Sequence, residues 1–367
     1  NDTNIETFTS SKNVTWSISG GEQNLFSINP NTGELKFKNP PDYETPFEPE
    51  GTILRFRTNY STSTVAEDFY IELYDKEHSQ NQTTPVTSNN FLEYVRDGSY
   101  DRTLIHRLVS DFVIQGGGYT WPTNASNELD GYPLKVTSKG EIINEPFNSN
   151  LMGTIAMAKV SGQPNSATSE WFINLSNNIN LNSQNEGFTV FGHILGDGIH
   201  NPLLLNELVK DKDYTDVQTY ELKLDFKSQP VVLADIPLNK MIDNSVKSDN
   251  FIIIKEISHV SERPSQIANK YNVIVSATDT DGNKSNQYVI IDIKDIQGEV
   301  LNGTNGINQL VGGIGNDVFQ GNGGNDAIDG GADYDIATYS GDFSDYTFNI
   351  VNKIVTVTDN RSSTNDG

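Results

Sequence analysis

Arg107, Phe112 and Gln115 stand in a stretch of residues 106–118 that alternates apolar and polar side chains, as a half-buried strand does, and ends in three glycines. One fixed cation, one aromatic ring and one amide would therefore share a face. A guanidinium keeps its charge at any ordinary pH and offers planar hydrogen-bond donors. Beside an apolar hollow, this combination suits a site that polarises or holds a carbonyl or an amide.

A second chemical pattern repeats every nine residues from Gly303. The units are GTNGINQLV, GGIGNDVFQ, GNGGNDAID and GGADYDIAT. This pattern resembles the glycine-rich nonapeptides of calcium-binding RTX proteins. Calcium takes about six to eight oxygen ligands, which turning glycine loops and one acidic residue per loop can supply. A flexible Gly/Asn/Asp linker is the alternative, and the regular period disfavours it.

The RTX resemblance implies a β-roll, in which successive loops fall on alternate sides and each calcium site pairs repeats two apart. The stronger pair joins the loop of Asp317 to that of Asp335, and the weaker joins that of Asn308 to that of Asp326. The expected calcium-site residues are Gly312, Ile314, Asp317, Gly330, Ala332, Asp335, Asp326 and Asn308.

The composition limits the remaining function classes. The 367 residues suffice for about two or three domains. A formal net charge of −24 disfavours nucleic acid as a partner and suits cations or solubility. The absence of cysteine excludes disulfides, and no apolar run approaches the roughly 18 residues of a membrane span. The start at Asn1, without Met or a signal pattern, and the abrupt end suggest an excerpt of a longer protein.

Many short strands and two helices are expected between residues 52 and 260. Ser88 could cap one helix that Gly98 closes, and Asn201-Pro202 could start the second. Their apolar positions have helical spacing. This pattern fits a closed barrel with helical plugs.

Several motifs within this segment occur in one order: FLEYVRDGSYDRTLIHRLVSDFVIQGGG, GTIAMAKV, NSATSEWFINL and GFTVFGHI. They resemble the cyclophilins, the β-barrel peptidyl-prolyl isomerases. The resemblance implies an eight-stranded barrel with two helices, proline-containing peptides or proteins as partners, and no cofactor for catalysis. By position, Arg107 is the essential arginine. The other implied site residues are Phe112, Val113, Phe172, Leu181 and Phe188 around the proline ring, and Gln115, Ala158 and Lys159 along the substrate chain.

The sequence departs from the family at several site positions. Val113 stands where methionine is usual, which makes one pocket wall shallower, and Glu170 replaces the usual glutamine. If Glu170 pairs with Arg107, the guanidinium is partly neutralised and its donors are diverted. His106 and Trp171 are interpreted as packing residues.

Two segments far apart in the sequence resemble halves of one cadherin-like repeat: FSINPNTGELKF near the start, and YNVIVSATD with QYVIIDI near residue 280. A guest domain inserted at an exposed loop would explain the separation; two unrelated β fragments are the alternative. The expected domains are 1–51 and 261–297 (cadherin-like β-sandwich), 52–260 (cyclophilin-like) and 298–367 (RTX). The acids Glu44, Asp279 and Asp281 are interpreted as turn formers rather than calcium ligands.

The preferred interpretation is a mainly β, secreted, multidomain peptidyl-prolyl isomerase. The RTX resemblance implies type I secretion to the cell surface or medium. The rival is a weak or inactive cyclophilin-like binding module of an extracellular, calcium-dependent adhesin. The sequence leaves the oligomeric state and the substrate undefined.

Overall fold

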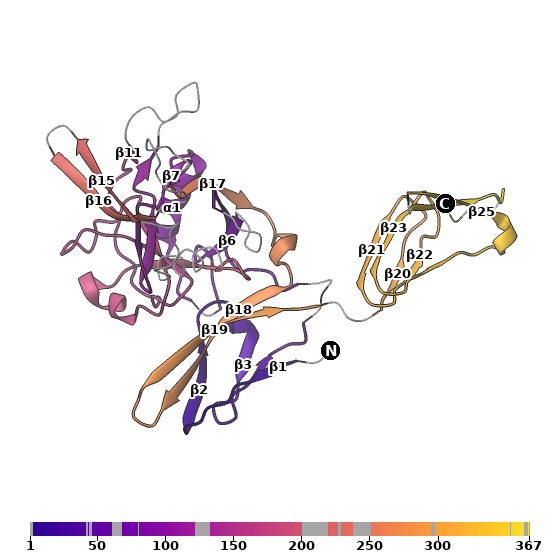
Figure 1. Ribbon diagram of the computed structural model, residues 1–367, viewed down its shortest axis with the longest axis horizontal. Helices are drawn as coiled ribbons and strands as arrows, with labels where there is room; N and C mark the ends of the chain where they lie inside the picture. Colours follow the sequence, from indigo (N-terminus) through magenta and orange to yellow (C-terminus); the bar gives the residue numbers. More distant parts are fainter. Residues whose placement is uncertain are drawn as a thin grey trace. The chain divides into compact units, whose positions relative to one another are not determined.

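The computed structural model describes residues 3–41, 43, 46–60, 68–79, 81–121, 133–199, 219–226, 229–237, 251–294, 298–352, 354–362 and 366. The chain divides into two compact units, Asn1–Asp292 and Ile293–Gly367. The described residues are mainly β, with one α-helix (Figure 1). The second helix expected from Asn201-Pro202 lies outside them.

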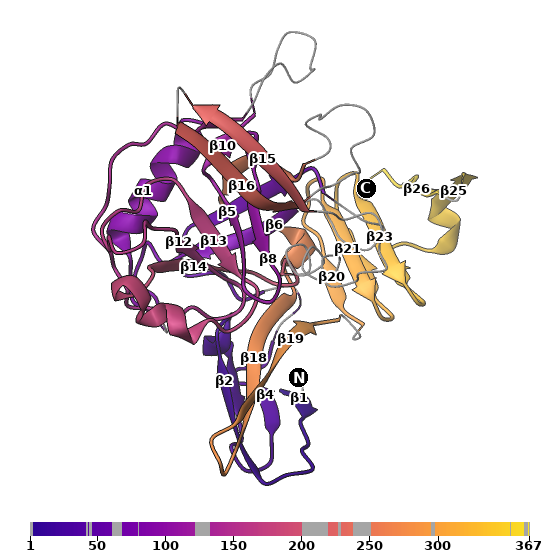
Figure 2. The ribbon, with the colours of Figure 1, turned by 60° about the vertical axis from the view of Figure 1, so that its left-hand side comes forward.

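A large sheet forms the centre of the first unit. Its strand order is β11-β10-β7-β17-β5-β6-β14-β12-β13-β9-β8, and Figure 2 shows it curling. Its strands are β5 (Ile53–Thr58), β6 (Asp68–Leu73), β7 (Thr103–Leu104), β8 (Arg107–Val109), β9 (Val113–Gly116), β10 (Tyr119–Thr120), β11 (Leu134–Lys135), β12 (Thr154–Met157), β13 (Trp171–Asn174), β14 (Val190–Ile194) and β17 (Ile253–Val260). The hairpin β15 (Thr219–Phe226) and β16 (Gln229–Pro237) is a separate two-stranded sheet.

The expected barrel had eight strands, whereas this sheet has eleven. The difference comes from three strands of two residues, β7, β10 and β11, which are too short for the alternation of the sequence to reveal. The sheet is curled but open, because no ladder joins β8 to β11 among the described residues.

Helix α1 (Pro85–Arg96) packs on this sheet through Phe91, Leu92 and Tyr94. It begins three residues before Ser88, the cap expected from the sequence. The Glu145 carboxylate accepts hydrogen bonds from the backbone N–H of Val86 (3.3 Å) and of Thr87 (2.8 Å), so a residue distant in sequence satisfies the helix start. In the described part of the chain, no helix is long and apolar enough to cross a membrane.

Both ends of the first unit contribute to two small sheets. One has the order β1-β4-β3 and the other β19-β18-β2, and Figure 1 shows the first strands beside β18 and β19. As the sequence predicted, the two distant segments pair: Trp16 lies opposite Ala277. Phe37 packs edge-on against Tyr271 of the other sheet, with 6.0 Å between ring centroids. The elements are β1 (Asn4–Thr7), β2 (Val14–Ser19), η1 (Gln23–Leu25), β3 (Phe26–Ile28), β4 (Glu34–Phe37), η5 (Ser265–Ile267), β18 (Lys270–Asp279) and β19 (Lys284–Asp292).

A buried ion pair joins these two distant segments. Arg263 Nη1 lies 2.7 Å from Glu22 Oε1, and the side chains are 1% and 6% exposed. The guanidinium also stacks on Tyr271. Asn272 extends the connection, because its side-chain amide donates to the backbone oxygens of Ile194 and Gly196 beside the large sheet.

Asp279 acts as a turn former, as expected. Its Oδ1 accepts the backbone N–H of Asp281 at 3.0 Å and of Asn283 at 2.9 Å. Glu44, the acid that the sequence grouped with it, lies outside the described residues.

The second unit contains two sheets of parallel strands. β20, β22 and β24 form one, β21 and β23 form the other, and paired residues are eighteen apart, as in Val318 and Ile336. Alternate nonapeptides therefore enter opposite sheets. A hairpin of β25 and β26 follows. The strands are β20 (Val300–Asn302), β21 (Gln309–Ile314), β22 (Val318–Gln320), β23 (Ala327–Ala332), β24 (Ile336–Thr338), β25 (Tyr346–Val351) and β26 (Ile354–Asp359), and the hairpin follows the 3-10 helix η6 (Phe343–Asp345).

Candidate active site

Four adjacent strands align the central residues of the candidate site. Arg107 on β8 lies opposite Gln115 on β9, Gln115 lies opposite Phe172 on β13, and Phe172 lies opposite Ala156 on β12. Directly opposed residues of neighbouring strands present their side chains on the same face of a sheet. The register therefore places the cation, the amide and the aromatic ring in one row.

Beside this row lies a small apolar cluster. Phe172, Val113 and Leu181 are buried in it, and Phe112, Ala158 and Phe188 are only partly buried against it. The ring of Phe188 stands edge-on to that of Phe172, with 5.7 Å between centroids. The structure thus gathers the apolar residues that the sequence proposed for the proline ring, with exposed edges that a ligand can reach.

The sequence missed three members of this cluster: Tyr74, Ala156 and Val190. Ala156 lies two residues before Ala158, so the period of a strand could have placed the two on one face. Val190 is opposite Ala156 on β14. No local pattern marks Tyr74, which joins the cluster from the end of β6 through tertiary packing.

The Arg107 guanidinium makes few contacts. Its Nη1 donates to Gln115 Oε1 at 3.5 Å, the only hydrogen bond of this side chain within the described ranges. Its central carbon lies 5.9 Å from the centroid of the Phe112 ring. Its other donors make no hydrogen bond to the described residues and can serve a ligand.

The expected ion pair between Glu170 and Arg107 is not formed between these described side chains. Glu170 Oε2 instead accepts from Gln115 Nε2 at 2.7 Å and lies 3.4 Å from His106 Nε2. Burial raises the pKa of Glu170, but the hydrogen bonds and charge of His106 and Gln115 outweigh it and lower the pKa overall. Gln115 therefore links the two charged groups. Its amide nitrogen donates to Glu170, which leaves the amide oxygen to face the Arg107 guanidinium.

Ala158 and Lys159 lie at the opposite edge of the cluster. The Ala158 N–H donates to the Glu170 carbonyl at 2.9 Å, so it serves the sheet. Lys159 Nζ donates to the carbonyls of Asn185 (2.9 Å) and Gly187 (2.5 Å) and lies 4.8 Å from the centroid of the Phe188 ring. Burial lowers the pKa of Lys159. Its ammonium fixes the loop that carries Phe188.

His106 and Trp171 are packing residues in this structure, as the sequence indicated. His106 is buried and stands edge-on to Tyr119, and Trp171 is fully buried against Phe56. His106 additionally faces the Glu170 carboxylate, a contact that the sequence alone did not suggest.

In the second unit, the last three of the four repeats each place an acid beside glycine and backbone oxygens. The Oδ1 atoms of Asp317, Asp326 and Asp335 accept backbone N–H groups from the residues eighteen positions earlier. Asp326 Oδ2 is buried without a hydrogen-bond partner. A Cβ added to Gly312 would lie 2.1 Å from Asp317 Oδ2 and 2.5 Å from the Gly330 oxygen, so only glycine leaves this oxygen-lined space open.

This arrangement fits a hard cation. Asp317 Oδ2 and the Gly330 carbonyl oxygen both lie close to Gly312, and among the described residues the buried Asp326 Oδ2 has no hydrogen-bond donor. The stronger predicted calcium set, around Asp317 and Asp335, and the weaker one, around Asn308 and Asp326, both lie in such loops. Strand β21 ends at Ile314, which pairs with Ala332 of β23, and Gly330 also lies in β23.

Comparison with known proteins identifies both regions. Residues 59–223 match the family model for cyclophilin type peptidyl-prolyl cis-trans isomerase/CLD, and residues 302–337 match that of the RTX calcium-binding nonapeptide repeat in four copies. Peptidyl-prolyl cis-trans isomerase B of Escherichia coli is 35% identical over 154 residues, which cover 40% of this chain and 79% of the relative. The chain belongs to the cyclophilin-type peptidyl-prolyl cis-trans isomerase family.

Other relatives agree. A peptidyl-prolyl cis-trans isomerase of Acinetobacter baylyi is 34% identical over 148 residues, which cover 39% of this chain and 66% of the relative. A crystal structure of a Cryptosporidium parvum cyclophilin type isomerase with the dipeptide Ala-Pro is 26% identical, covers 57% of this chain and 99% of its own, and has a TM-score of 0.35. The family match and the sequence relatives show that the chain carries a cyclophilin-type peptidyl-prolyl cis-trans isomerase.

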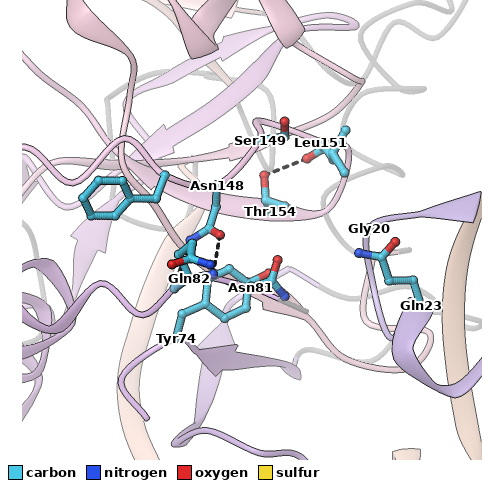
Figure 3. A pocket seen from close by; sticks show the side chains of 10 residues that line it. Gly20, Gln23, Tyr74, Asn81, Gln82, Asn148, Ser149, Leu151 and Thr154 are labelled. Carbon is cyan, nitrogen blue, oxygen red and sulfur yellow. Dashed lines mark hydrogen bonds between the residues drawn. The ribbon is translucent and has the colours of Figure 1, made fainter. Parts of the chain in front are cut away.

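A separate pocket of about 390 Å³ lies between the cyclophilin domain and the N-terminal segment. Figure 3 shows Gly20 and Gln23 on one side and Tyr74, Gln82 and Asn148 on the other. Asn148 Nδ2 donates to the Gln82 carbonyl at 2.8 Å across its floor. Tyr74 borders both this pocket and the apolar cluster, but none of the predicted catalytic residues lines the pocket.

Proposed function

We propose that the cyclophilin domain rotates X–Pro bonds at the face formed by Arg107, Phe172 and their neighbours. The observation that carries the proposal is the cross-strand row, in which the partly buried Arg107 guanidinium stands beside an apolar cluster with partly exposed aromatic rings. The proline ring would enter that cluster, and the preceding residue would extend along β9 and β13.

Rotation needs no proton transfer and no covalent intermediate. Resonance holds the X–Pro bond planar with a barrier of about 18–20 kcal/mol. Twisting the bond breaks that resonance, makes the proline nitrogen pyramidal and leaves it a lone pair. Arg107 donates to this lone pair, which exists only in the twisted state, and such selective stabilisation lowers the barrier. Phe172, Val113 and Leu181 hold the ring while the carbonyl side turns.

Exchange spectroscopy by NMR on an Ala-Pro peptide tests this proposal. The full chain should accelerate exchange between the cis and trans signals, and the peptide should broaden resonances of residues around Phe172 and Phe188. Binding at that face without acceleration would reject isomerisation.

One observation favours the rival function, a binding module with weak catalysis. Gln115 turns its amide oxygen toward Arg107 because Glu170 accepts from its nitrogen. An N–H of Arg107 that donates to Gln115 is not free to donate to the substrate. Glu170→Gln distinguishes the two: a marked gain in turnover supports a restrained enzyme, whereas tight binding with negligible turnover in both proteins supports the module.

For the architecture, we propose that residues 1–51 and 261–297 form one cadherin-like β-sandwich interrupted by the cyclophilin domain at 52–260. Its support is the ladder between β2 and β18 and the Glu22–Arg263 pair. Because the chain has no cysteine, Thr15→Cys with Thr278→Cys, which are opposed in this ladder, tests it by disulfide formation under mild oxidation. Thr15→Cys with Ser285→Cys on β19 is the control that should not crosslink; the reverse pattern contradicts the interrupted domain.

For residues 298–367, we propose an RTX β-roll that binds Ca²⁺ as a structural ion in a protein exported by type I secretion. Support comes from the RTX match and from the oxygen-lined glycine loops at Asp317 and Asp335. Extracellular calcium modules bind at roughly 10⁻⁴–10⁻³ M, so this segment would fold after export. Limited proteolysis of the full chain with calcium or chelator tests it; equal cleavage of this segment in both would contradict calcium-driven folding.

A further inference from the structure

Glu72, His78 and His193 form a buried cluster that neither isomerisation nor the calcium repeats use. Glu72 on β6 lies directly opposite His193 on β14 in the sheet register. His78 follows β6 in the next loop. The three side chains each offer one nitrogen or oxygen atom, and these atoms all lie within 4.8 Å of one another.

The spacing is close to that of a metal centre. His78 Nε2 lies 3.7 Å from Glu72 Oε1, and His193 Nε2 lies 3.6 Å from Glu72 Oε2. Ligands about 2.0–2.1 Å from a tetrahedral zinc ion stand roughly 3.3 Å apart, so small side-chain shifts complete the geometry. Glu72 Oε1 also accepts the Gly51 N–H at 2.6 Å, whereas His193 Nε2 lies beyond ordinary hydrogen-bond distance from Glu72 Oε2.

His193 supplies an independent indication. Its side chain is 2% exposed, and neither Nδ1 nor Nε2 has a hydrogen-bond partner. Buried polar groups nearly always have a hydrogen-bond partner or a metal ion. A buried imidazole without a hydrogen bond, placed beside a carboxylate, therefore indicates a further ligand.

The surroundings add space, charge and a supporting carboxylate. A cavity of about 20 Å³, lined in part by Glu50, Glu72 and His78, adjoins the cluster, and one ion or water fits such a volume. Glu50 Oε2 lies 3.1 Å from His78 Nδ1, which leaves Nε2 toward Glu72. A carboxylate behind a ligating histidine is the usual outer support of a zinc ligand.

We propose that Glu72, His78 and His193 bind one zinc-type divalent transition-metal ion. Two imidazoles and one carboxylate suit borderline cations, whereas calcium and magnesium prefer all-oxygen sets. The side chains of Glu72, His78 and His193 are 4%, 4% and 2% exposed, so the site is closed and braces structure. One water completes four-coordination, with Glu50 behind His78.

The ion would stabilise the side of the large sheet on which Tyr74 supports the apolar cluster around Phe172. Tyr74 packs edge-on against His78 at 5.2 Å and beside His193 at 5.7 Å between ring centroids. The same ring belongs to the apolar cluster of Val113 and Phe172. Metal binding therefore ties β6, β14 and the loop before α1 together beneath Tyr74.

The test uses the full, tag-free chain, stripped with chelator and returned to excess calcium so that the RTX repeats are saturated. Zinc titration should give one tight equivalent, and thermal unfolding should shift upward with zinc. Cobalt substitution should give the strong visible absorption of a tetrahedral nitrogen and oxygen site. A weak, hexaaqua-like cobalt spectrum, or no retained zinc after dialysis, would overturn the proposal without any variant.

Variants locate the site. His78→Gln and His193→Gln should each abolish the tight equivalent, and Glu50→Gln should weaken it about 10–100-fold, as loss of an outer-shell partner does. His259→Gln is the matched control, because that histidine is exposed on β17, and it should bind like the unaltered chain. If the buried His193 variant fails to fold, His78→Gln, which changes a loop residue, decides alone. Unchanged zinc affinity in His78→Gln would place the ion elsewhere and refute the assignment.

Discussion

Replacing Arg107 by alanine should lower kcat/KM for an X–Pro peptide by about 10²–10³, the usual cost of removing one transition-state donor. The loss should fall on kcat, because the donor interacts with the twisted bond and hardly at all with the planar one. Peptide affinity should change little, since the apolar cluster around Phe172 remains.

The same substitution should scarcely affect folding. Within the described part of the chain, Arg107 makes one long hydrogen bond, 3.5 Å to Gln115, and its guanidinium lies 5.9 Å from the centroid of the Phe112 ring. Exposed cation–π contacts contribute about 0.5–1 kcal/mol, so the free energy of unfolding should fall by about 1 kcal/mol. Urea unfolding measures this small loss of stability, which can then be compared with the expected loss of about 2.7–4 kcal/mol in transition-state stabilisation.

Exchange NMR at saturating and subsaturating peptide gives kcat and KM separately. Arg96→Ala, an exposed arginine in the last turn of α1, is the matched control and should keep the full rate. If kcat of the Arg107 variant falls by less than about threefold while the fold stays intact, the donor role is refuted. Such a change is far smaller than the loss that follows removal of a transition-state donor.

Three further predictions concern other parts of the chain. Glu170 has a folded-state pKa below its ordinary 4.5, so its contribution to stability is complete above that pH and is lost as the pH falls through the folded-state pKa. Urea unfolding of Glu170→Gln should therefore differ from that of the unaltered chain at pH 7, and the difference should shrink as the pH is lowered below 4.5. Glu22→Gln leaves the buried cation of Arg263 without its counter-charge and should cost about 3–5 kcal/mol in denaturant unfolding; a cost below about 1 kcal/mol would show that the pair is not needed. Asp317→Asn should weaken calcium binding in calorimetric titration, whereas Asp329→Asn, an exposed acid of the same repeats, should not; equal effects would contradict the ligand assignment.

The sequence could predict what depends on local pattern. Alternation predicted the strands β8 and β9 with Arg107 and Gln115, and the nine-residue period predicted stacked strands with an acid at a fixed place in three of the four loops. That residues 1–51 would meet residues 261–297 was expected from their resemblance to two halves of one repeat, and β2 pairs with β18. Strands of two residues were not expected, since alternation needs more residues to become visible.

Tertiary structure decided the partners of the charged and polar groups. Glu170 binds Gln115 and His106 rather than Arg107, because strand register and side-chain direction set which donor is nearest. Glu145 fixes the start of α1 from a distant loop. Glu72 meets His193 only because β6 and β14 pair in one register, since a shift of one residue would turn either side chain to the other face. Local sequence determines which face a side chain can use, whereas contacts between distant segments determine what it meets there.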